Sequence, residues 1–285
     1  MKSSLECVPC YLKQVLSTIK EATKDEELQL AALQAAAEEI GKLSLKDTPA
    51  ENSSYVLKAA QKVLMDDDPF SRKKLKYNRI ALRMYPQLRR RIKRSKNPLY
   101  TAIKVALAGN IIDMGILPSF DLKKTLKEIL NSPLAIDDFD EFRKDLEKSS
   151  NILYLGDNIG EIVFDKLLVE ELSPRKVFFA VKSGPILNDA TLEDARLVKM
   201  DEVATVITTG TDMLGTPLKQ CSAKFKDIFN SADLIISKGQ ANYETLSEVK
   251  ANIYFLLKAK CEVIARDLGV RCGDAVFKKI AGKAR

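Results

Sequence analysis

The sequence contains no histidine and no tryptophan. The absence of histidine excludes imidazole as a general base, a nucleophile or a metal ligand. Any metal ion must therefore be bound by carboxylates, amides and water, or by cysteine thiolates. Oxygen ligands favour hard or borderline cations of the magnesium or manganese kind.

Long apolar runs are missing as well. No stretch approaches the roughly 20 apolar residues that a membrane-spanning helix needs. Glu6, Pro9 and Lys13 interrupt the amino terminus before the apolar segment of a signal peptide could form. Hydrophobic residues make up 46% of the chain and charged residues 30%, which is the balance of a globular protein. We therefore expect a cytoplasmic protein with no membrane partner.

The five cysteines are odd in number and mostly far apart, which is not the pattern of a disulfide-stabilised secreted protein. We expect reduced thiols. Cys7 and Cys10 have the CxxC spacing of a redox pair or of half a zinc site. Zinc would need two more ligands, and Cys261 and Cys272 lack zinc-knuckle spacing. Two reduced core cysteines are the simpler alternative.

The apolar pattern divides the chain of 285 residues into two parts. From Leu5 to about Leu146, apolar residues recur every three or four positions, which predicts helices. From Ser149 onward, short β-branched runs alternate with helical stretches, which is typical of βαβ units and a parallel sheet. We predict an α/β protein with a helical domain (1–148) and a Rossmann-like, doubly wound, mostly parallel domain (149–285). The predicted strands are Ile152–Leu155, Val177–Val181, Ala204–Thr208, Leu234–Ser237 and Ile253–Leu257, with Ala275–Phe277 as a further edge strand.

Polar side chains follow the first two of these strands. Ligands of open parallel sheets bind beyond the carboxyl ends of the strands. Asp157 and Asn158 follow the first strand, and Asn188 and Asp189 follow the second. Either pair could simply cap a helix. Asp189 could instead complete an oxygen-only metal site with Asp157 and Asn158, and Lys182 could meet a phosphate.

Two later strand ends also carry polar groups. The loop from Thr208 to Thr216 could line a phosphate pocket or be an ordinary connection. Lys238, with Asn242 and Glu244 at the head of the next helix, offers a positive charge and further polar groups to the same cleft.

In the helical half, the apolar pattern predicts that Asn110 and Asp113 lie within an apolar helix. Asn110 is either a hydrogen-bonded core residue or a group that reaches into the cleft between the domains.

Four motifs combine the residues described above: Gly-Asp157-Asn158-Ile-Gly-Glu161, Lys182-Ser-Gly-Pro-Ile-Leu-Asn188-Asp189-Ala-Thr, Lys238-Gly-Gln-Ala-Asn242-Tyr-Glu244 and Gly109-Asn110-Ile-Ile-Asp113. Their order and spacing resemble the damage-control phosphatase family, also known as domain of unknown function eighty-nine. Cys7-Val-Pro-Cys10 is similar to the amino-terminal mark of its prokaryotic subfamily, and Asp68-Pro69-Phe70 with Lys74 and Asn78 also matches.

The resemblance implies hydrolysis of phosphate monoesters that depends on manganese, nickel, cobalt or magnesium. It implies Asp157, Asn158 and Asp189 as metal ligands, and Lys238 and Asn110 as residues of the substrate pocket. The implied partner is a small phosphorylated metabolite that is damaged or overaccumulated. Damaged purine nucleotides or their intermediates are the targets suggested for the CxxC subfamily, and sugar phosphates are a second class.

Our mechanistic hypothesis is that the cation either activates a water or orients Asp157 for attack. Lys182 and Lys238 would stabilise the charge on the transferring phosphoryl group. Solvent or a carboxylic acid such as Glu161 would protonate the leaving oxygen.

Two other functions fit parts of the sequence. A transferase that depends on a nucleotide or on S-adenosylmethionine would use the glycine-flanked acidic loop around Asp157. A nucleic-acid-binding module would use the basic cluster Arg89–Lys96, and its affinity would fall steeply with salt. No aromatic residues interleave that cluster, so we regard nucleic acid as an unlikely partner.

Overall fold

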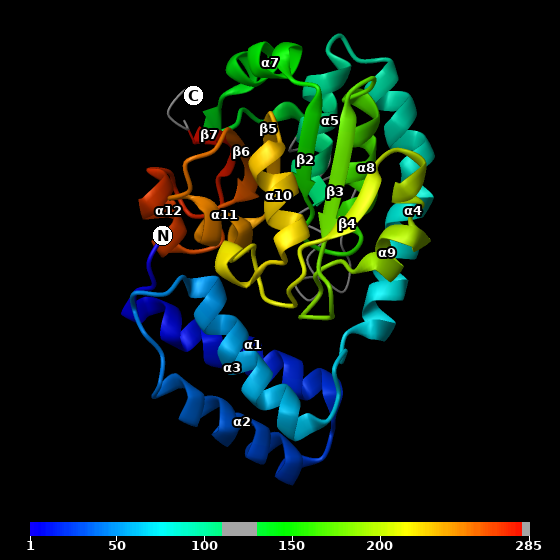
Figure 1. The fold of residues 1–285 in the computed structure, drawn as a ribbon. Helices are drawn as coiled ribbons and strands as arrows, with labels where there is room; N and C mark the ends of the chain where they lie inside the picture. The colour runs from blue at the N-terminus through cyan, green and yellow to red at the C-terminus, as the bar shows by residue number, and fades with distance from the viewer. Residues whose placement is uncertain (110–129, 281–285) are drawn as a thin grey trace.

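The computed structural model describes residues 1–109 and 130–280 of the chain. Its first elements are the short 3-10 turn η1 (Leu5–Cys7) and the helices α1 (Val8–Ala22), α2 (Glu26–Ile40) and α3 (Pro49–Leu64). These helices share one apolar cluster and form a layer of their own (Figure 1). Helix α3 begins at Pro49, because Thr48 and Glu51 form a reciprocal capping box.

The next helices lie beside the sheet rather than with the first layer. α4 (Ser71–Lys93) and α5 (Pro98–Gly109) pack with α8 (Glu161–Glu171) in one apolar cluster (Figure 1). α7 (Phe139–Lys148) contributes Phe142 and Leu146 to the same cluster. The predicted boundary at residue 148 follows the order of the elements along the chain. In space, α4, α5 and α7 precede this boundary but cover the sheet.

Seven strands form one sheet in the order β1-β7-β6-β5-β2-β3-β4. The five predicted strands are confirmed, and all neighbouring strands are parallel except β6 and β7. The strands are β1 (Ile136–Asp137), β2 (Asn151–Leu155), β3 (Lys176–Val181), β4 (Thr205–Thr208), β5 (Leu234–Lys238), β6 (Ile253–Lys258) and β7 (Ala275–Ile280).

The prediction of an edge strand near Ala275 is wrong in one respect. β7 lies between β6 and β1, so the two-residue strand β1 forms the edge. Two residues are too few for the period of two that identifies a strand in a sequence, which is why β1 was not predicted.

The order in which the chain adds strands runs in opposite directions on the two sides of the β2–β5 pair. From β2 the chain continues outward to β3 and β4, whereas β5 lies on the other side of β2 and leads to β6. The loops after β2 and β5 therefore diverge. Such a switch point is where open α/β sheets bind their ligands.

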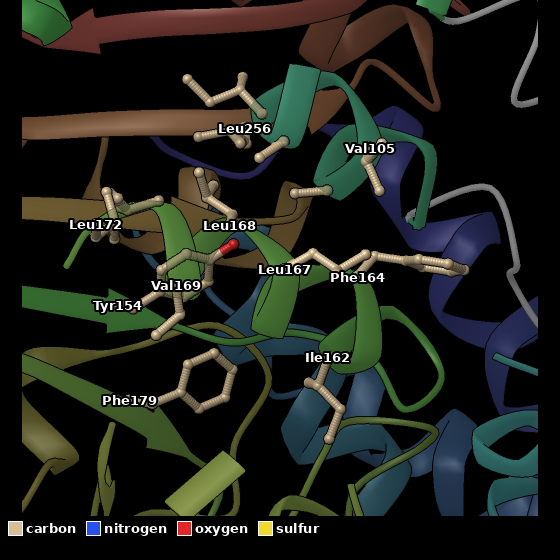
Figure 2. Packing of buried hydrophobic residues seen from close by; sticks show 14 of the residues in the cluster. Val105, Tyr154, Ile162, Phe164, Leu167, Leu168, Val169, Leu172, Phe179 and Leu256 are labelled. Carbon is tan, nitrogen blue, oxygen red and sulfur yellow. The ribbon is translucent and has the colours of Figure 1, made fainter. Parts of the chain in front are cut away.

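Alternate residues of β2 point to opposite faces of the sheet. Tyr154 joins the cluster with α8, where its ring stacks on Phe179 with 5.1 Å between the centroids (Figure 2). Leu153 and Leu155 join a second cluster with α10, α11 and α12 on the other face. The sheet is therefore covered on both sides. The remaining elements are α9 (Leu192–Leu197), η2 (Met200–Glu202), η3 (Leu218–Gln220), α10 (Ala223–Ser231), α11 (Gln240–Leu246) and α12 (Glu262–Leu268).

Within residues 1–109 and 130–280, no helix combines the length and the apolar character that a bilayer crossing requires.

Candidate active site

Two loops at the switch point bring the predicted metal ligands together. The backbone N–H of Ala190 donates to the carbonyl of Asp157 at 2.8 Å, and the N–H of Ile159 donates to the carbonyl of Asn188 at 2.9 Å. Asn158 and Asp189 consequently face each other in an isolated antiparallel bridge. The loops after β2 and β3 thus place two carboxylates and one amide side by side.

The loop after β5 closes around Asp157. Gly239 has a φ of +80°, and a Cβ atom there would lie 1.9 Å from Oδ2 of Asp157. Only glycine leaves room for the carboxylate and adopts this backbone conformation without strain. A glycine at the end of β5 therefore fixes where the Asp157 carboxylate can lie.

The side chain of Asn158 is held by two neighbouring carboxylates. Its Nδ2 donates to Oδ2 of Asp157 at 3.0 Å and to Oε2 of Glu161 at 3.3 Å. Because the nitrogen is used for these bonds, the carbonyl oxygen Oδ1 is the atom of Asn158 suited to a cation.

Burial and mutual repulsion make it unfavourable for the carboxyl groups of this cluster to carry negative charge. Burial, followed by the charges of Asp189 and Glu161, raises the pKa of Asp157 well above its usual value. Burial also raises the pKa of Asp189, against the opposing charge of Lys182. A bound cation would relieve the cost of placing these carboxylates together in a buried site.

One buried carboxylate oxygen of Asp189 accepts no hydrogen bond from the part of the chain that the structure describes. No described residue donates a hydrogen bond to its buried Oδ2, and the ammonium of Lys182 lies 3.5 Å away. Within the described ranges, no three side chains of the His, Cys, Asp and Glu types are grouped to hold a metal ion. A ligand set of two carboxylates and one amide, completed by water or substrate, is the composition that the residues fit.

Lys182 is buried next to this set. It donates to the carbonyl of Gly215 and forms the ion pair with Asp189. Gly215 belongs to the Thr208–Thr216 loop, which Ser54 anchors by accepting the N–H of Leu214 at 2.9 Å. This predicted loop therefore lies beside Lys182.

Lys238 is fully buried and is committed to groups of the protein. Its ammonium donates to Glu161, to Oδ1 of Asp165 at 2.6 Å and to the carbonyl of Ala106 at 3.0 Å. Tyr154 also donates to Oδ1 of Asp165 at 2.8 Å. Burial alone would lower the pKa of Lys238, but the charges of Asp165 and Glu161 outweigh it and raise the pKa. These acceptors use all three N–H groups of the ammonium, so the predicted substrate contact would require one of these bonds to break.

Asn242 joins three loops of the site. Its Nδ2 donates to the carbonyls of Lys238 at 2.7 Å and Gly156 at 3.3 Å, and its Oδ1 accepts from Thr216 at 2.7 Å. Asn242 therefore links the end of β5 to the loops after β2 and β4.

Glu244 and the cysteine pair lie near the amino terminus. Gln240 donates to Glu244 at 2.9 Å, and the terminal ammonium donates to the Glu244 carbonyl at 2.8 Å. Cys7 is buried with Sγ 3.5 Å from Oγ of Ser4, Cys10 is exposed, and both thiols are free. Glu244 and Cys7 therefore contact residues of this region.

Two predicted positions, Asn110 and Asp113, lie outside the described residues.

Sequence reasoning assigned no role to the inner face of α4. Oδ1 of Asn78 accepts the N–H of Gly160 at 2.6 Å, and its Nδ2 donates to Asp194 at 2.9 Å. Lys74, one turn earlier, is also buried. The spacing that buries Ala81 also turns Lys74 and Asn78 inward, and this signal was present in the sequence.

The fold and the site define a class of protein: an α/β protein with acidic and amide groups gathered at the switch point of a mostly parallel sheet. The model of the Damage-control phosphatase ARMT1-like domain matches residues 3–276. The chain therefore belongs to the damage-control phosphatase family, which confirms the resemblance seen in its motifs.

Similar proteins span nearly the whole chain. A damage-control phosphatase of Pyrococcus horikoshii is 39% identical over 283 residues, which cover 97% of each chain. One of Archaeoglobus fulgidus is 34% identical over 289 residues, which cover 98% of this chain and all of the relative. The crystal structure of a DUF89 family protein of P. horikoshii superposes with a TM-score of 0.90 at 38% identity, and the match covers 98% of this chain and 99% of that one.

Proposed function

We propose that this protein is a metal-dependent phosphatase that hydrolyses phosphate monoesters of small metabolites. The observation that carries the proposal is the pairing of buried Asp157 and Asp189 on two hydrogen-bonded loops at the switch point. Membership of a phosphatase family supports the reaction class.

Asp157, Asn158 and Asp189 would hold the cation, which is manganese, nickel, cobalt or magnesium. When bound, such a cation neutralises phosphate oxygens and favours attack on phosphorus. Lys182 supplies a further positive charge next to Asp189. The carboxylate of Asp157 would either orient a water or attack the phosphoryl group itself.

Glu161 serves a positioning role in this proposal. Its Oε1 accepts from Lys238 and its Oε2 accepts from Asn158. With both oxygens engaged, the carboxylate holds the amide of Asn158 in place, and solvent protonates the leaving oxygen.

The substrates we propose are damaged purine nucleotides or their intermediates, or sugar phosphates. The rival nucleic-acid function loses part of its basis, because Arg89 and Lys93 pair with Glu170 and Glu171 of α8 at 2.7 and 2.8 Å. These members of the basic cluster join two helices.

The test is hydrolysis of p-nitrophenyl phosphate by the full chain, with and without a chelator and with manganese added back. Asp157→Asn and Asp189→Asn should each lower kcat/KM by about 10²-fold or more, because each removes charge that stabilises the bound cation. The matched control is Asp233→Asn at the opposite end of the sheet, where the carboxylate accepts the N–H groups of Ser150 and Asn151. Hydrolysis that survives chelation and both site substitutions would contradict the proposal.

A further inference from the structure

Lys74 differs from the other basic residues of α4. Its neighbours Arg72 and Lys76 are exposed, whereas Lys74 is only 3% exposed. A buried ammonium is costly unless acceptors surround it. Its burial therefore requires nearby groups that accept hydrogen bonds from its ammonium.

The described protein groups use only part of the hydrogen-bonding capacity of Lys74. Among the described residues, its one hydrogen-bond acceptor is Oδ2 of Asp68, at 3.1 Å. Lys238, which is also buried beside the site, reaches three acceptors. An ammonium has three N–H donors, so Lys74 can donate further bonds to a ligand.

Lys74 lies on the face of α4 that packs against the active-site loops. One turn further along α4, Asn78 accepts the N–H of Gly160 in the loop that carries Asp157. Nδ2 of Asn78 donates to Asp194 at 2.9 Å, and Asp194 accepts the N–H of Thr191 at 3.0 Å, two residues after Asp189. The inner face of α4 thus borders the metal-ligand loops.

Asp68, the partner of Lys74, and Asp189, the ion-pair partner of Lys182, each keep one oxygen without a hydrogen bond from the described residues. Oδ1 of Asp68 and Oδ2 of Asp189 are both buried, and no described group donates a hydrogen bond to either. A cation beside Asp189 together with an anion on Lys74 would satisfy the charges of this region. A phosphate group supplies oxygen acceptors for lysine and for the cation at once.

We propose that Lys74 binds the phosphate group of the substrate, and that Asp68 positions its ammonium. This inference rests on the proposed phosphatase function. It adds a substrate-binding residue from the helical part of the chain to the loops of the sheet.

The experiment measures binding rather than turnover alone. Calorimetry of the full-length protein gives the affinity for manganese, and then the affinity for inorganic phosphate in the presence of manganese. Lys74→Gln should weaken phosphate binding about tenfold or more, since it removes a charge-assisted hydrogen bond. Its manganese affinity should stay within about threefold, and Lys74→Arg should retain most of the phosphate affinity.

Lys166→Gln is the matched control. Lys166 is also buried on a helix and pairs with Glu202 at 3.0 Å, but its other acceptor is the carbonyl of Val198. It should bind phosphate like the wild type. If Lys74→Gln does so too, the role of Lys74 is wrong while the phosphatase proposal stands.

Two further outcomes are informative. If the wild type neither binds manganese nor hydrolyses p-nitrophenyl phosphate, the proposed function fails and the role of Lys74 fails with it. If Lys74→Gln does not fold, Asp68→Asn decides: weakened phosphate binding supports the inference, and wild-type affinity overturns it.

Discussion

Gly239→Ala tests whether the end of β5 sets the position of Asp157. The residue has φ +80° and ψ 165°, a region that is essentially restricted to glycine and costs about 1–3 kcal/mol for other residues. The added Cβ would also lie 1.9 Å from Oδ2 and 2.4 Å from Cγ of Asp157. The carboxylate must therefore move, and a displacement of about 1 Å at such a site can cost about 10²-fold in rate.

Gly269→Ala provides the matched control. Gly269 ends α12 with φ +74°, and nothing lies within 4 Å of a Cβ built there. Both variants carry a backbone penalty, of about 1–2 kcal/mol for Gly269→Ala, but only Gly239→Ala has the clash. Urea unfolding and the hydrolysis of p-nitrophenyl phosphate should show loss of stability in both and about 10²-fold loss of kcat/KM in Gly239→Ala alone. Equal activity in the two variants would refute the reasoning.

Three other outcomes follow from the buried charges. Lys238→Met leaves Glu161 and Asp165 buried without their cation, so urea unfolding at pH 7 should show a loss of about 3–5 kcal/mol; a loss below 1 kcal/mol would contradict this. Burial raises the pKa of Glu244 from 4.5 to about 7, so the folded state holds a proton that the unfolded state releases, and stability should fall as pH rises between these values. Glu244→Gln should flatten that part of the curve of unfolding free energy against pH, and an unchanged slope would exclude Glu244 as its source. Manganese should raise the Tm of the wild type more than that of Asp189→Asn, because a ligand that binds only the folded state stabilises it; equal shifts would argue against Asp189 as a ligand.

The meeting of Asp157 with Asp189 could be predicted from the sequence. Short apolar, β-branched runs identified β2 and β3, and parallel neighbouring strands end at the same edge. The hydrogen bonds that align the two loops, such as Ala190 to Asp157, depend on the loop backbone and were not predictable. The antiparallel direction of β7 likewise depends on the short connection after α12, which no apolar pattern encodes.

The surroundings of Lys238 were only partly predictable from the sequence. Leu234 and Ile236 face the cluster around α8, so the alternation of β5 directs Lys238 to the same face. Glu161 and Asp165, four residues apart, lie on one face of α8. Both patterns were visible separately. That they meet at hydrogen-bonding distance depends on the packing of α8 on the sheet, which the sequence pattern alone does not determine.

The three buried lysines of the site differ in how many acceptors the described chain gives them, and this difference separates their roles. Lys238 donates to three acceptors of the protein, so its replacement should mainly lower the stability of the fold. Lys182 donates to one carbonyl, and its Nζ lies 3.5 Å from Oδ2 of Asp189, one of the proposed metal ligands. Lys74 bonds only Asp68, so its loss should appear mainly in phosphate affinity. Because the chain has no histidine, the positive charge of the site comes from lysine side chains such as these.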